Sequence, residues 1–123
     1  MSDRTTTIDQ LQQIVRDFVD ERDWQQFHSP KNLAMGLAIE AAELMEHFQW
    51  IDVEQSRRLA DDPQKVAAAG EELADVFSYC LILADALNID LSEAVRSKMI
   101  KNAEKYPANE YRGRYGDQDD GQR

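Results

Sequence analysis

Apolar residues recur every three to four positions along most of the chain, a spacing that predicts amphipathic α-helices. No segment alternates apolar and polar residues as a half-buried strand would. The first predicted helix covers about residues 8–22, and Thr7 with Gln10 predicts a capping box at its start. Its apolar side is formed by Ile8, Leu11, Ile14, Val15, Phe18 and Val19.

Two long helices in the middle of the chain begin with the same signal. Ser29 and Asp62 are each followed by a proline, and proline is favoured at the first position of a helix. These N-caps predict helices over about 30–50 and 63–87. A short helix over 53–60 is predicted between them.

The last predicted helix begins at Asp90 and ends near Lys105, because Pro107 disfavours helix in the residue before it. Helices joined by short links predict an all-α fold, a bundle of four to five helices formed by residues 1–107. Residues 108–123 are polar and rich in glycine, which predicts a disordered tail.

The chain has 123 residues, the length of one ordinary domain, and its surplus of apolar helix faces predicts a homo-oligomer. Acidic residues outnumber basic ones by 24 to 14, and such a surface repels duplex DNA and anionic membranes. No apolar run approaches the roughly 20 residues that span a bilayer. The single cysteine, Cys80, and the absence of a signal peptide pattern predict a cytoplasmic protein.

Two pairs of carboxylates, each three residues apart, lie within the two long apolar helices. Glu40 and Glu43 form the first pair, and Glu72 and Asp75 form the second. Residues at this spacing share a helix face, where two anions repel each other and resist burial. If the two helices pack antiparallel, both pairs face one another and offer oxygen ligands suited to one or two Mg²⁺ ions.

Other interpretations of these acids remain open at this stage. Most pairs of this kind lie on solvated helix faces, although apolar neighbours on both sides of two pairs favour a metal site. A di-iron bundle is disfavoured because it needs histidine three residues after a glutamate, whereas His47 follows Glu43 by four.

Cations and aromatic rings supply further candidate ligand contacts. Lys98, Asn102 and Lys105 share one helix face and predict a phosphate clamp, or else a solvated helix end. The two tryptophans, Trp24 and Trp50, suit stacking on a nucleobase, or core packing. Three further candidates are judged from their neighbours in sequence, namely Tyr79 one turn after Asp75, Tyr106 beside Lys105, and His28 just before Ser29.

These residues resemble the MazG-like all-α nucleoside triphosphate pyrophosphohydrolases, and within them the dCTP pyrophosphatases. The resemblance covers about residues 8–107 and begins with the E-x-x-E and E-x-x-D pairs. Three more strings carry it: E-R-D-W-Q-Q-F-H-S-P-K-N-L at 21–33, F-Q-W at 48–50, and S-K-M-I-K-N-A-E-K-Y-P at 97–107. The chain departs from the dCTP branch at Ile39 and Ala42, where that branch often has glycine, and this leaves the base preference open.

The resemblance implies a Mg²⁺-dependent enzyme that cleaves a deoxynucleoside triphosphate, dCTP or a base-modified dCTP, to the monophosphate and pyrophosphate. It implies that the four acids hold the metal, and it implies a tetramer. It assigns substrate binding to Trp24, His28, Trp50, Tyr79, Lys98, Asn102, Lys105 and Tyr106. The alternatives are a house-cleaning hydrolase for another nucleotide, such as dUTP or an oxidised purine, and a helical interaction module without enzymatic activity.

Overall fold

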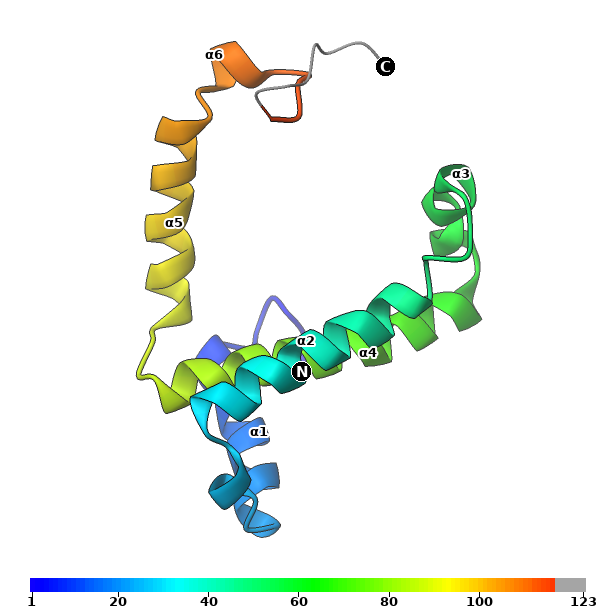
Figure 1. Ribbon diagram of the computed structural model, residues 1–123. Coiled ribbons are helices and arrows are strands. Elements are labelled where there is room, and N and C mark those ends of the chain that lie inside the picture. Colours follow the sequence, from blue (N-terminus) through cyan, green and yellow to red (C-terminus); the bar gives the residue numbers. More distant parts are fainter. Residues whose placement is uncertain (117–123) are drawn as a thin grey trace. The chain divides into compact units, whose positions relative to one another are not determined.

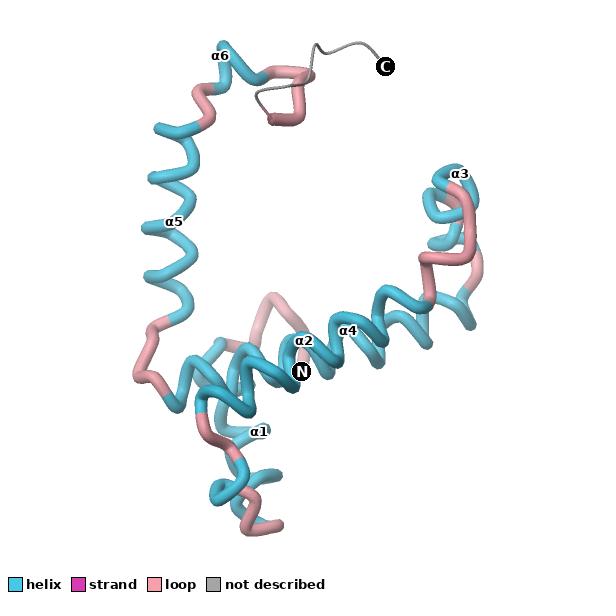
Figure 2. Tube along the Cα trace, viewed as in Figure 1, coloured by secondary structure: helices cyan, strands magenta, loops and turns pink. Residues whose placement is uncertain are grey.

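The computed structural model describes residues 1–116, and every regular element within them is helical, as the sequence predicts (Figures 1 and 2). The chain forms two compact units, Met1–Ile89 and Asp90–Arg123, which are described separately. The prediction of a single domain over residues 1–107 therefore stays a prediction.

The first unit is built on two long helices, α2 (Pro30–Glu46) and α4 (Pro63–Ala86). They lie side by side and run in opposite directions, and α1 (Ile8–Glu21) packs against α4 (Figure 1). The short helix α3 (Val53–Arg57) and two 3₁₀ turns complete the unit, the turns being Gln25–Phe27 and Leu59–Asp61.

Side-chain caps fix the helix starts where the sequence predicts them. Thr7 and Gln10 form the predicted capping box, with the Gln10 amide donating to Thr7 Oγ1 over 3.1 Å. Ser29 Oγ accepts from the Asn32 amide at 3.1 Å, and the Asp62 carboxylate accepts from the first turn of α4.

Helix α2 ends at Glu46, four residues before the end predicted at residue 50. The residues that follow bond in tight turns, for example from the Phe48 amide to the Met45 carbonyl. Asp52 then caps α3 with a capping box to Gln55 that the sequence analysis missed. The chain must leave the axis of α2 to form this cap, and the longer helix prediction was wrong for that reason.

The second unit contains α5 (Leu91–Lys105) and the four-residue helix α6 (Ala108–Tyr111). Asp90 caps α5, as predicted, by accepting from the Glu93 amide. Helix α6 occupies the first four residues of the predicted disordered tail, and the Tyr111 ring packs edge-on against Tyr106 with centroids 5.2 Å apart. The end of that predicted tail, residues 117–123, lies outside the described residues.

The core of the first unit is small and lies where its three longest helices meet. Among the described residues, the apolar side chains that are fully buried are Val19, Leu33, Leu81 and Ala84. Many large apolar side chains stay exposed, including Met35, Ile39, Leu73 and Phe77. None of the described helices combines the length and the hydropathy that a membrane crossing requires.

Leu33 is only 1% exposed, so its replacement tests this small core. We expect Leu33→Ala to lower the free energy of unfolding by about 2–5 kcal/mol, because it leaves a cavity between the helices. The matched control is Leu87→Ala, at a leucine that is 50% exposed and just beyond α4, and it should cost less than about 1 kcal/mol. Equal losses in urea denaturation would contradict this placement of the core.

Candidate functional site

Three of the four predicted metal ligands converge between α2 and α4. Glu40 and Glu43 lie one turn apart on α2, and Glu72 faces them from α4. One oxygen of each carboxylate lies within 4.8 Å of the others. Glu40 Oε2 and Glu72 Oε2 are buried without a hydrogen-bond partner. The antiparallel packing that the sequence suggested is therefore confirmed, and it brings these acids together.

The electrostatics of the cluster are unfavourable without a cation. Burial raises the pKa of Glu40 above its ordinary value of 4.5, and a shared hydrogen bond with Glu43 raises it further. The charges of Glu43, Asp75 and Glu72 add to the same effect. Asp75 thus acts on Glu40 through its charge, although its oxygens do not belong to the cluster of three.

The donor set fits a hard divalent cation. Carboxylate oxygens are the ligands that Mg²⁺ prefers, and the two unpartnered oxygens are the kind of atom that a cation satisfies. His47 follows α2 and places Nε2 3.7 Å from Glu72 Oε1, at the edge of the cluster. His47 follows Glu43 by four residues in the sequence, and this spacing predicts that the two side chains share a helix face.

A cavity of about 350 Å³, named the aromatic cavity for the Trp24, Phe18 and Tyr79 rings that line it, lies between α1 and α4 in the same unit. It brings together four residues that the sequence singled out: Trp24, His28, Asp75 and Tyr79. The remaining lining residues, which the sequence analysis placed in the apolar stripe or did not mention, are Ile14, Val15, Phe18, Val19, Ser78 and Ile82. The Phe18 ring stands edge-on to Trp24 with centroids 5.7 Å apart. The cavity is therefore lined mainly by apolar and aromatic side chains, with a few polar groups among them.

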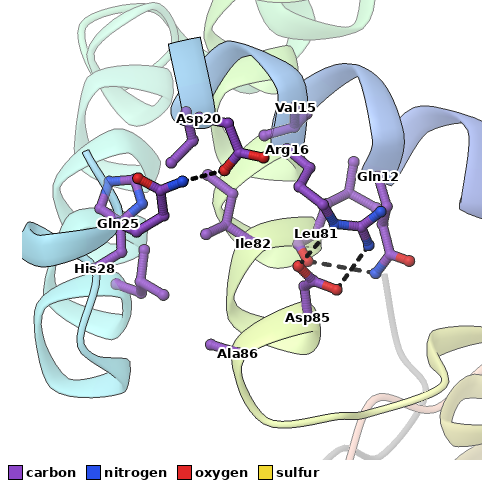
Figure 3. A pocket seen from close by; sticks show the side chains of 12 residues that line it. Gln12, Val15, Arg16, Asp20, Gln25, His28, Leu81, Ile82, Asp85 and Ala86 are labelled. Carbon is purple, nitrogen blue, oxygen red and sulfur yellow. Dashed lines mark hydrogen bonds and ion pairs between the residues drawn. The ribbon is translucent and has the colours of Figure 1, made fainter. Parts of the chain in front are cut away.

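A second cavity, of about 280 Å³, is also lined by residues of α1 and α4 (Figure 3). Its rim carries a two-point ion pair in which Arg16 Nη2 donates to Asp85 Oδ1 at 2.8 Å. The hydrogen bond from Arg16 lowers the pKa of the Asp85 carboxyl. His28 lines both cavities, and its Nδ1 is buried without a hydrogen-bond partner. The sequence analysis missed Arg16 and Asp85, which are 69 positions apart and meet only through helix packing.

The other residues predicted to bind the substrate do not line the aromatic cavity within the first unit. Trp50 lies between α2 and α3 and is 83% exposed, whereas Trp24 is 43% exposed and lines the cavity. The predicted phosphate contacts belong to the second unit, on α5 and directly after it: Lys98, Asn102, Lys105 and Tyr106. Their roles stay predictions.

Comparison with known proteins shows the family of this chain. The sequence profile of the MazG-like family matches residues 36–117, which include all four acids. The chain belongs to the MazG-like family. The pyrophosphatase from Archaeoglobus fulgidus DSM 4304 has a similar solved structure, with a TM-score of 0.76, 39% identity, and coverage of 87% of this chain and 98% of that chain.

Curated relatives of this MazG-like chain include dCTP pyrophosphatase 1 from Mus musculus, 41% identical over 107 residues, and the Homo sapiens protein, 41% identical over 103 residues. The matches cover 87% and 84% of this chain. The chain spans only 63% and 61% of the length of these relatives.

The pKa shift of Glu40 predicts how the cluster affects stability. A raised pKa in the folded state means that this group's contribution to stability is complete below pH 4.5 and is lost as the pH rises through the folded pKa. In metal-free buffer we therefore expect Glu40→Gln to melt above wild type at pH 7, with the difference vanishing near pH 4. Glu46→Gln, at an exposed acid on the same helix, is the control and should show no such trend. A Glu40→Gln protein that melts below wild type at pH 7 would contradict the view that the ionised Glu40 carboxylate destabilises the metal-free fold.

Proposed function

We propose that this protein is a Mg²⁺-dependent pyrophosphohydrolase that converts a deoxynucleoside triphosphate, dCTP or a base-modified dCTP, to the monophosphate and pyrophosphate. The observation that carries the proposal is the position of Asp75. It lines the aromatic cavity and also acts on Glu40 in the carboxylate cluster, so the cation site and a slot for a flat ring adjoin. The relatives named dCTP pyrophosphatase 1 support the same activity.

Glu40, Glu43, Glu72 and Asp75 would hold the metal. When bound there, Mg²⁺ neutralises charge on the phosphate oxygens of the substrate. The carboxylates themselves position the attacking water, and one that keeps a free oxygen accepts its proton. The three converging acids come from facing helices whose starts are capped, so they are held by rigid elements.

The aromatic cavity is proposed as the base site. Its volume of about 350 Å³ lies at the small end of ligand pockets, which suits one nucleobase rather than a whole nucleotide. Trp24 offers a ring for stacking, and His28 and Tyr79 offer polar atoms for the edge of the base. Trp50 is proposed as a second stacking residue from the family resemblance.

The phosphate contacts are proposed on α5, from the resemblance and from their chemistry. Lys98, Asn102 and Lys105 recur on one face of this helix, and Tyr106 follows at its end. Lysine ammonium groups attract phosphate as point charges, and the asparagine amide adds a directed hydrogen bond.

A homo-oligomer, a tetramer by the resemblance, is proposed as the working state. The first unit leaves large apolar side chains of α2 and α4 exposed, in two stripes: Met35 and Ile39 on α2, and Leu73 and Phe77 on α4. Residues four apart share a helix face, so each stripe is continuous and suits burial against another copy.

The test of this function is a panel of ribo- and deoxynucleoside triphosphates incubated with Mg²⁺, in which pyrophosphate and orthophosphate are measured separately. Pyrophosphate release with dCTP or a 5-substituted dCTP as the preferred substrate is expected. Preference for dUTP or an oxidised purine would assign the protein to another branch of house-cleaning hydrolases. Absence of turnover with every nucleotide would contradict the proposed activity and favour a helical interaction module without enzymatic activity.

Neutralising the acids one at a time separates a metal site from a solvated acidic surface. We expect Glu40→Gln, Glu43→Gln, Glu72→Gln and Asp75→Asn each to lower kcat/KM by at least about 100-fold, because each removes charge that holds the metal. Mg²⁺ should raise the melting temperature of wild type, since it binds only the folded state, and should do so less in each variant. Glu71→Gln is the control, at an exposed acid next to Glu72. Four variants with wild-type activity and the full Mg²⁺ shift would contradict the site.

Trp24 tests the assignment of the aromatic cavity to the base. Base stacking contributes about 1–3 kcal/mol in ground and transition states alike, so Trp24→Ala should raise KM by about 5- to 150-fold with kcat nearly unchanged. Trp24→Phe keeps a stacking ring and should recover most of the loss. An unchanged KM together with a large fall in melting temperature would instead assign Trp24 to the core.

A further inference from the structure

Gly36 lies on α2 one turn before Glu40, with its open side against the ring of Tyr79 on α4. A Cβ atom at Gly36 would stand 2.5 Å from Tyr79 Cε1 and 2.9 Å from Tyr79 Cζ. Non-bonded carbon atoms prefer about 3.5–4.0 Å, so a side chain at this position requires the ring to move. The absence of a side chain at residue 36 therefore allows the ring to lie directly on the backbone of α2.

The same tyrosine is a wall of the aromatic cavity. Tyr79 lines it together with Trp24 and Asp75, and none of the residues that line it comes from α2. The ring thus stands between α2 and the cavity. A Tyr79 ring pushed away from Gly36 moves toward Trp24 and narrows the space between them.

We propose that Gly36 is a positioning residue that holds Tyr79 back against α2 and so determines how large a base the aromatic cavity accepts. This inference rests on the proposed function, because it takes the cavity as the base site. It goes further by assigning a size limit on the base to the contact between residues 36 and 79. A base with a substituent on its ring is the ligand that this contact admits.

The contact also places the tyrosine relative to the acids. Asp75 precedes Tyr79 by one turn of α4, and Glu40 follows Gly36 by one turn of α2. The ring therefore rests on α2 one turn before the carboxylate cluster. A displaced ring changes the fit of the base while the carboxylates keep their own helices, so binding should respond more than the chemical step.

The first experiment compares Gly36→Ala with wild type on dCTP and 5-methyl-dCTP. The displaced ring should raise KM for 5-methyl-dCTP more than for dCTP, changing the ratio of the two values by about tenfold, the lower end of the effect of one methylene in a hydrophobic pocket. The kcat values should stay within about threefold of wild type, since the groups that hold the metal are unchanged.

Gly70→Ala is the matched control. Gly70 is also a glycine within a long helix, α4, but a Cβ atom there would meet nothing within 4 Å. This variant makes the same chemical change without touching a ring. It should keep the wild-type ratio of KM values and should melt at or above the wild-type temperature, because alanine favours helix over glycine.

The second experiment repeats Gly36→Ala in a Tyr79→Ala background. Without the ring, the added methyl group has nothing to displace, so it should leave the KM ratio unchanged. The melting temperature should stay the same or rise, because alanine favours helix over glycine. An equal effect of Gly36→Ala with and without the tyrosine ring would overturn the inference. A wild-type KM ratio in the single variant would overturn it as well, as would a large fall in melting temperature with an unchanged ratio.

Binding measurements separate this inference from the proposed function. Calorimetry with dCMP and 5-methyl-dCMP reports the fit of the base without hydrolysis. If wild type binds both monophosphates but cleaves none of the triphosphates, the proposed activity fails. The same tenfold change in the ratio of dissociation constants between Gly36→Ala and wild type still supports the role of Gly36. If wild type binds neither nucleotide, the cavity is not a base site and the inference fails with it.

Discussion

The convergence of carboxylates between α2 and α4 is the constraint on which the rest of the first unit depends. Glu40, Glu43 and Glu72 are brought within 4.8 Å of one another, with buried oxygens on two of them left unpartnered. Helix packing alone does not favour such an arrangement, because like charges at this distance repel and resist burial. The capped helices hold the acids in place, and the divalent cation of the proposed function would offset their repulsion.

The aromatic cavity follows from the same helix, because Glu72 and Tyr79 are two turns apart and share one face of α4. Glu72 lies against the acids of α2, and Tyr79 lies against Gly36 of α2 and lines the cavity. Asp75 lies between these residues in sequence and acts on both sides. The ion pair of Arg16 with Asp85 then ties α1 to the end of α4. The proposed metal site and the proposed base site are thus connected through one rigid element.

The sequence predicted the helices and the convergence of Glu40, Glu43 and Glu72 well, because both depend largely on local spacing. The caps at Thr7 and Ser29 and the shared face of Glu40 and Glu43 could be derived without knowing the packing. The end of α2 could not, since it depends on the competing cap at Asp52. Contacts that exist only after the helices pack were also missed, namely those of Arg16 with Asp85 and of Gly36 with Tyr79.

The central claim is that the acids between α2 and α4 hold a divalent cation, and it is tested most directly by diffraction from crystals grown with Mn²⁺ as a substitute for Mg²⁺. An anomalous difference peak about 2.2 Å from oxygens of Glu40, Glu43 and Glu72 is the expected result, since Mn²⁺ favours the same oxygen ligands. Omission of Mn²⁺ from the crystals should remove the peak. A fully hydrated Mn²⁺ ion elsewhere, with these carboxylates bonded only to water or to cationic side chains, would contradict a cation site between α2 and α4.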